Sequence, residues 1–272
     1  LNFIDAPGLF DFENGAAEAV RAAEAVLIVT SAGSGVDVGT EKAFKAAEKR
    51  GLAKFFAITK TDSDHRSFYK TFEALKEVYG NKLCPTIIPY MEGNITKSYV
   101  NLMTGMAYEY DAEGKATKVP MPNDPIIEEM TSAFMEAVAT TDDELMEKFF
   151  EGETFTPDEI LKGLCTGIFD GSIYPVYAVA GLTGAGVDQL LYNLAWSVPG
   201  AFGYAGETAK NEAGEDVILP CDINGPLAAV CFKTVADPFV GKMSFFKVVS
   251  GKLTPDTQAY NVRTGEIEKM GK

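Results

Sequence analysis

The chain has 272 residues, of which 46% are hydrophobic, and its formal net charge is −15. This length predicts one large domain, or one domain plus part of another. The negative charge excludes a protein that holds DNA or RNA by its overall charge, but a local basic face that docks on a large ribonucleoprotein stays open. Four scattered cysteines indicate free thiols in a reducing cytoplasm, and the apolar runs are too short to predict a membrane span.

The first eighty residues alternate between predicted strands and predicted helices. An apolar stretch at 1–4 predicts a strand, and the continuous apolar runs at 25–30 and 55–59 are typical of strands buried on both faces. Helical periodicity covers residues 40–50 and 67–79. This alternation predicts an α/β fold with a mostly parallel sheet.

The alternation breaks at residues 85–165, which we interpret as an insertion between two strands of the sheet. It contains a predicted hairpin, with strands at 106–110 and 116–119, followed by three acidic helical segments near 126–139, 142–151 and 157–167. A strand at 174–179 and a further helix resume the α/β pattern.

The last third of the chain has a different composition. Residues 201–225 are rich in Gly, Pro and acidic residues and predict a linker, whereas 226–272 contain short strands separated by turn residues. The composition therefore predicts a first domain at 1–200, a linker, and part of an antiparallel β-barrel domain.

The first predicted strand ends in a motif suited to a metal and a phosphate, Asp5-Ala6-Pro7-Gly8. The Asp5 carboxylate would bind Mg²⁺ through water, and the Gly8 backbone N–H would face a terminal phosphate. Taken alone, the motif is explained equally well by a simple turn from a strand into a loop.

The strand at 55–59 leads into a second motif, Thr59-Lys60-Thr61-Asp62. The Asp62 carboxylate can accept hydrogen bonds from guanine N1–H and the exocyclic amine, whereas adenine offers neither donor. The Lys60 stem can lie along the base. A polar loop with chance charges is the alternative for this motif alone.

The strand at 174–179 leads into the third motif, Ala180-Gly181-Leu182, where a backbone N–H can reach the guanine carbonyl oxygen. Because α/β sheets bind ligands at the carboxyl ends of their strands, the three motifs together predict a guanine-nucleotide site. A phosphate loop needs Gly-x-x-x-x-Gly-Lys-Ser/Thr, and the glycines at 33–39 lack the lysine. That stretch predicts a loop ending in a helix N-cap at Thr40, and we expect a P-loop-type sheet without its phosphate-loop part.

These motifs, with residues 1–12, 145–153 and 236–248, resemble elongation factor G along essentially the whole chain. The resemblance implies a translational GTPase with a G′-type insertion and part of domain II. It also implies GTP or GDP and Mg²⁺ as ligands, and a cytoplasmic protein that acts on the ribosome, through rRNA and ribosomal proteins, in translocation during translation elongation. Neither DNA nor a membrane is an expected partner.

Three positions depart from the family pattern. Leu9 occupies the position of the catalytic His and has no atom that can orient a water molecule, Thr59 replaces an Asn, and Ala180-Gly181 replaces Ser-Ala. We therefore interpret the chain as an internal piece of a divergent member, inactive by itself. The alternative is a non-hydrolysing ribosome-binding or ribosomal-protection-like factor. A third idea, an α/β metabolic enzyme, has no acid/base pair or cofactor fingerprint in its favour.

Overall fold

The computed structural model describes residues 1–8, 10–63, 67–200, 206–211 and 213–270, so Leu9 lies outside the described residues. The chain divides into two compact units. The larger unit comprises Leu1–Ala16 and Ala23–Val198, and the smaller one comprises Ala17–Ala22 and Pro199–Lys272.

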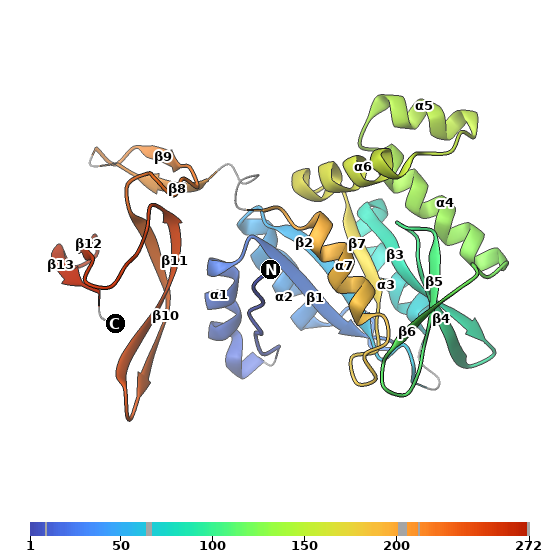
Figure 1. Ribbon diagram of the computed structural model, residues 1–272, viewed down its shortest axis with the longest axis horizontal. Coiled ribbons are helices and arrows are strands. Elements are labelled where there is room, and N and C mark those ends of the chain that lie inside the picture. Colours follow the sequence, from blue (N-terminus) through green and yellow to red (C-terminus); the bar gives the residue numbers. More distant parts are fainter. Residues whose placement is uncertain (9, 64–66, 201–205, 212, 271–272) are drawn as a thin grey trace. The chain divides into compact units, whose positions relative to one another are not determined.

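The larger unit contains a seven-stranded sheet in the described residues, in the order β1-β2-β7-β3-β4-β5-β6 (Figure 1). Neighbouring strands in the first half run parallel, and those from β3 to β6 run antiparallel. The bounds are β1 (Ala25–Ser31), β2 (Ala53–Thr59), β3 (Leu83–Glu92), β4 (Ile95–Asn101), β5 (Met106–Tyr110), β6 (Ala116–Val119) and β7 (Tyr174–Ala178). The predicted α/β class is confirmed, and the sheet continues into the segment expected to be an insertion.

Helices pack against this sheet and against one another. In contact are α2 with β1 and β2, α3 with β2 and β3, α4 with β3, and α6 with β7 and α7. The helical bounds are η1 (Phe10–Phe12), α1 (Glu13–Ala22), α2 (Val38–Lys49), α3 (Phe68–Tyr79), η2 (Gly80–Lys82), α4 (Pro125–Ala139), α5 (Asp143–Glu151), α6 (Pro157–Asp170) and α7 (Val187–Ser197).

The N-cap of α2 corrects one expectation. The Asp37 carboxylate accepts hydrogen bonds from the Thr40 backbone N–H at 2.7 Å and from the Thr40 hydroxyl at 2.8 Å. Asp37 therefore caps the helix, and Thr40 lies inside its first turn. A carboxylate is a strong acceptor for an otherwise unpaired N–H at a helix start, which explains why the helix begins earlier than predicted.

One continuous hydrophobic core joins the parallel strands to the inserted segment. Phe56 of β2, Tyr177 of β7, Phe134 of α4 and Leu164 of α6 are all fully buried in it. Burying one such side chain contributes about 1.5–3 kcal/mol. The inserted helices therefore fold together with the sheet and share its stability.

The strand predicted at residues 1–4 is wrong. The segment 1–8 forms no strand, and Leu1, Phe3 and Ile4 are 65%, 64% and 50% exposed. An apolar run becomes a strand only when a neighbouring strand satisfies its backbone N–H and C=O groups. Among the described residues, β1 pairs with β2 alone and residues 1–4 pair with no strand.

The smaller unit contains three two-stranded antiparallel sheets in its described residues. Their strands are β8 (Glu207–Lys210), β9 (Asp216–Leu219), β10 (Ala228–Asp237), β11 (Gly241–Ser250), β12 (Gln258–Asn261) and β13 (Glu266–Lys269). The segment 201–225, expected to be a linker, thus includes the β8–β9 hairpin. Its turn is closed by Asn211, whose side-chain oxygen accepts from the Glu215 N–H at 2.9 Å, so polar composition here marks a turn. None of the described helices is long and apolar enough to cross a membrane.

The close packing of α6 gives a stability prediction. A Cβ atom at Gly167 would lie 2.5 Å from Ile173 Cγ1 and 2.9 Å from Thr141 Cγ2, both on stiff β-branched side chains. We expect Gly167→Ala to lower the free energy of unfolding by about 1–3 kcal/mol despite alanine's higher helix propensity. Thr166→Ala, on the exposed side of the same helix, should change it by less than about 0.5 kcal/mol. Urea unfolding measures both, and equal midpoints would contradict the packing.

Candidate functional site

The loops that follow β2 and β7 meet at the carboxyl edge of the parallel strands (Figure 1). The Val179 N–H donates to the Ile58 carbonyl at 3.0 Å, and the Thr61 N–H lies 3.5 Å from the Val179 carbonyl oxygen. The two predicted base loops, 59–62 and 180–182, are therefore held side by side by backbone hydrogen bonds.

Thr61 is the junction between these loops and the inserted strands. Its side chain is buried, and its hydroxyl donates to the Val179 carbonyl at 3.0 Å. The hydroxyl of Tyr99, on β4, lies 2.9 Å from Thr61 Oγ1. Because the single Thr61 hydroxyl proton is already donated, Tyr99 donates in this second bond. Burial raises the pKa of Tyr99 to about 12, so the phenol keeps that proton at neutral pH.

The Asp62 carboxylate is oriented by the loop after β7. The Thr183 hydroxyl donates to Asp62 Oδ2 at 3.1 Å, which leaves Oδ1 without a hydrogen bond among the described residues. One acceptor atom is thus fixed by the protein and the other can receive a donor from a ligand. Sequence reasoning missed Thr183 because its role depends on a contact between distant loops.

Lys60 is held in an unusual backbone conformation. Its φ is +61°, in the left-handed region that side chains other than glycine rarely adopt. Such a conformation costs roughly 1–2 kcal/mol and persists only where the surrounding structure imposes it. Backbone strain of this kind clusters at functional sites.

The third motif forms a tight turn. The Ala180 N–H donates to the Ala185 carbonyl and the Gly184 N–H donates to the Ala180 carbonyl, both at 2.8 Å. Leu182, at the tip, is fully exposed. A Cβ atom at Gly181 would lie 3.7 Å from Thr59 Oγ1, so the base loops approach each other at these two residues as well.

The motif at residues 5–8, called the Asp5 loop from here on, lies beside the segment that follows β1. The Gly8 carbonyl oxygen would be 3.6 Å from a Cβ atom on Gly39, at the start of α2, and Pro7 lies against Gly15. Asp5, Pro7 and Gly8 are exposed, and Ala6 is half-buried. The structure therefore brings the two base loops together, and it places the Asp5 loop against helix starts.

The side chains available to bind a metal ion suit one whose ligands come mostly from a bound nucleotide. No group of three or more His, Cys, Asp or Glu side chains in the described part of the chain could hold a metal ion. Asp5 offers one exposed carboxylate. Mg²⁺ keeps several waters and commonly binds through one or two carboxylates plus substrate phosphates, so Asp5 fits a magnesium–nucleotide complex.

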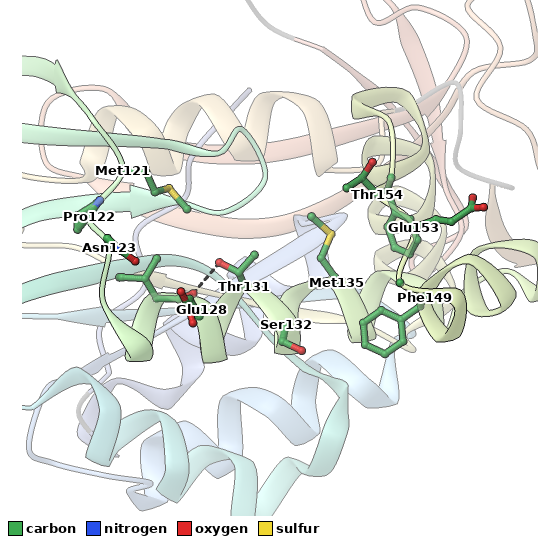
Figure 2. A pocket seen from close by; sticks show the side chains of 13 residues that line it. Met121, Pro122, Asn123, Glu128, Thr131, Ser132, Met135, Phe149, Glu153 and Thr154 are labelled. Carbon is green, nitrogen blue, oxygen red and sulfur yellow. Dashed lines mark hydrogen bonds between the residues drawn. The ribbon is translucent and has the colours of Figure 1, made fainter.

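A cavity of about 830 Å³ lies elsewhere in the larger unit, between the connector at 121–123, α4 and the segment after α5 (Figure 2). Its walls are largely apolar, with side chains of Met121, Met135 and Phe149. It contains none of the predicted nucleotide residues. Two carboxylates, Glu128 and Glu153, line the cavity, but it does not lie at the carboxyl ends of the parallel strands, where α/β sheets bind their ligands. The loops 59–62 and 180–182 are therefore the better candidate for a guanine site.

The fold and these loops agree with a known family. A family model for the elongation factor Tu GTP binding domain matches residues 1–199. The chain belongs to the elongation factor Tu GTP-binding domain family. The family description names a GTP-binding domain of an elongation factor, in agreement with the three base and phosphate motifs predicted in this part of the chain.

Relatives and solved structures also resemble the chain. It is 30% identical to an elongation factor G-like protein of Thermotoga maritima over 273 residues, covering 98% of this chain and 39% of that protein. It is 30% identical to elongation factor G of Amoebophilus asiaticus over 279 residues, covering 100% and 39%. A crystal structure of a Thermus thermophilus protein matches with a TM-score of 0.75 and 30% identity, covering 93% of this chain and 36% of that one. The resemblance to elongation factor G is confirmed, and the chain spans about two fifths of these curated relatives.

The backbone strain at Lys60 can be separated from the predicted contact of its side chain with a base. We expect Lys60→Ala and Lys60→Gly to weaken GDP binding equally, since both remove the stem. Lys60→Gly should be more stable than Lys60→Ala by roughly 1 kcal/mol, because glycine adopts a positive φ without strain. Fluorescent-GDP titration and urea unfolding measure the two effects. Equal stability of the two variants would contradict a strained Lys60.

Proposed function

We propose that the protein carrying this chain is an elongation factor G-like GTPase of the cytoplasm, which binds GTP or GDP with Mg²⁺ and acts on the ribosome in translocation. The observation that carries this proposal is the meeting of the two base loops, where Thr183 orients the Asp62 carboxylate. Family membership and the relatives named elongation factor G support the assignment to translation.

Base recognition follows from the groups at this junction. Asp62 would accept hydrogen bonds from guanine N1–H and the exocyclic amine, and a backbone N–H of Gly181 or Leu182 would donate to the guanine carbonyl oxygen. The Lys60 stem would cover the base. With adenine, the carboxylate would lose water without gaining a donor, which costs about 1–3 kcal/mol or more for a charged group.

The phosphate end would involve the Asp5 loop. Asp5 would hold the metal through water, and the Gly8 N–H would donate to the terminal phosphate. Bound Mg²⁺ would neutralise the charge that develops on the phosphate oxygens. Among the described residues, no atom lies within 4 Å of a Cβ atom placed on Gly8, so the side-chain position of this residue is open.

The partner proposed from the resemblance is the ribosome, through its rRNA and its proteins. Neither DNA nor a membrane is proposed as a partner. The net charge of −15 on this chain would make its contact with a nucleic acid local and specific in shape, since the overall field of these 272 residues repels a nucleic acid.

One observation favours a second candidate function. Leu9 stands where the family has its catalytic His, and a leucine cannot hydrogen-bond the attacking water. The alternative is a non-hydrolysing ribosome-binding or ribosomal-protection-like factor that uses the nucleotide as a conformational ligand.

Base selectivity tests the proposed function. We expect GDP, and not ADP, to displace a fluorescent GDP from the whole protein. Asp62→Asn should weaken GDP at least tenfold and improve xanthosine diphosphate, because the amide can donate to the xanthine carbonyl. Asp143→Asn, an exposed carboxylate on α5, is the matched control and should change neither affinity. Equal displacement by ADP and GDP would overturn the assignment.

Hydrolysis is tested at Leu9. We expect Leu9→His to raise ribosome-stimulated GTP turnover by tenfold or more, since general acid–base catalysis by a positioned side chain contributes about 10²–10⁴-fold. Leu9→Phe, which has a ring without nitrogen atoms, should not. Steady-state phosphate release measures both. If the unaltered protein turns over GTP as fast as Leu9→His, another group orients the water. If it binds to ribosomes without any turnover, the alternative function is favoured.

A further inference from the structure

The inserted strands reach the base loops from the far half of the sheet. β4, β5 and β6 extend the sheet beyond β3, and Tyr99 of β4 is buried with its hydroxyl on Thr61. A second bond comes from the same strand, in which the Thr96 hydroxyl donates to the Thr61 carbonyl at 2.7 Å. Thr61 is therefore held on its side chain and on its backbone by β4.

Tyr99 also contacts the loop after β7. A Cβ atom at Gly186, which has a φ of +77°, would lie 3.1 Å from the Tyr99 ring and 2.8 Å from the Ala178 carbonyl oxygen. The ring thus fills the space beside Gly186, the N-cap of α7, where the turn that contains the third motif ends. Through its hydroxyl and its ring, one tyrosine of the insertion reaches Thr61 in the first base loop and Gly186 at the end of the turn that contains the second.

The turn between β5 and β6 makes an independent contact. A Cβ atom at Gly114 would lie 2.6 Å from the Thr183 carbonyl oxygen, so two backbones approach each other directly. The turn is fixed by Asp111, whose Oδ1 accepts from the Glu113 N–H at 3.1 Å and from the Lys115 N–H at 2.8 Å. Since Thr183 in turn orients Asp62, this turn lies one residue away from the carboxylate that would read the base.

We propose that Tyr99 and Gly114 are positioning residues that set guanine selectivity, with the β4–β6 segment of the insertion acting as a support for both base loops. The proposal rests on the proposed function of Asp62 as the group that recognises guanine. Tyr99 would fix Thr61 and Gly114 would fix Thr183, so that the Asp62 carboxylate and the backbone N–H groups of 181–182 keep their spacing. Neither residue would touch the nucleotide.

The experiment compares nucleotides that differ only at the base. Affinities of the whole protein for GDP, inosine diphosphate and ADP are measured by titration. Inosine lacks the exocyclic amine, so the ratio of GDP affinity to inosine diphosphate affinity reports how well Asp62 is placed. We expect Tyr99→Phe to lower this ratio about three- to tenfold, as for the loss of one hydrogen bond, and Gly114→Ala to lower it tenfold or more.

Matched controls exist for both variants. Gly105→Ala places a side chain at a φ of +65° in the β4–β5 turn, where nothing lies within 4 Å. Tyr69→Phe removes another tyrosine hydroxyl, which donates to the Pro89 carbonyl at 2.6 Å. Both should lower stability and leave the affinity ratio within about twofold, because neither residue contacts the base loops. Thr96→Val repeats the test through the backbone contact if Gly114→Ala does not fold.

The outcomes separate this proposal from the function on which it rests. A wild-type protein that prefers GDP to ADP, with Tyr99→Phe and Gly114→Ala as selective as their controls, would overturn the supporting role alone. A wild-type protein without preference for GDP over ADP would overturn the proposed function and the supporting role together. Lower selectivity in both variants and not in the controls is the result we expect.

Discussion

The Thr61 hydroxyl is the contact on which the rest of the candidate site depends. It donates to the Val179 carbonyl and accepts from Tyr99, so one buried oxygen joins the loop after β2, the loop after β7 and the inserted strand β4. Leaving a buried donor or acceptor without its partner costs about 1–3 kcal/mol. Each of the three groups joined by these hydrogen bonds has its partner. The loops are therefore fixed relative to each other before any ligand binds.

Such fixed loops suit selective recognition of a base. A carboxylate that reads guanine must be held at one distance from the backbone N–H groups that read the carbonyl oxygen, and small displacements weaken both contacts. The strained backbone of Lys60 and the close approach of Gly114 to Thr183 show that the surroundings impose this arrangement. Because Tyr99 and Val100 of β4 and Ala107 of β5 belong to the hydrophobic core of the sheet, the support is part of the same cooperative structure.

Sequence reasoning reaches the parts of this structure that depend on local patterns. The apolar runs at 25–30 and 55–59 predict β1 and β2, since strands buried on both faces need continuous apolar residues. β3 is absent from the sequence prediction, in which an insertion begins at residue 85. Its two prolines, Pro85 and Pro89, are unusual in a central strand. The structure accommodates Pro85 through an irregular register with β7. The apolar residues at 1–4 gave the opposite error, a predicted strand that does not form, because the sequence does not show whether a neighbouring strand exists.

The same limit applies to the candidate site. Residues 59–62 and 180–182 can be proposed from their types and their places at strand ends, and their role in binding stays a prediction. The support from Tyr99 and Gly114 could not be predicted, because it consists of contacts between segments far apart in the chain, 38 positions in the case of Tyr99 and Thr61.

The most direct measurement is backbone hydrogen exchange of the whole protein with and without GDP. We predict joint protection of 59–62, 180–186 and 95–101, with no change at the apolar cavity around 121–123. Protection at the cavity, or at the base loops without β4, would contradict the account.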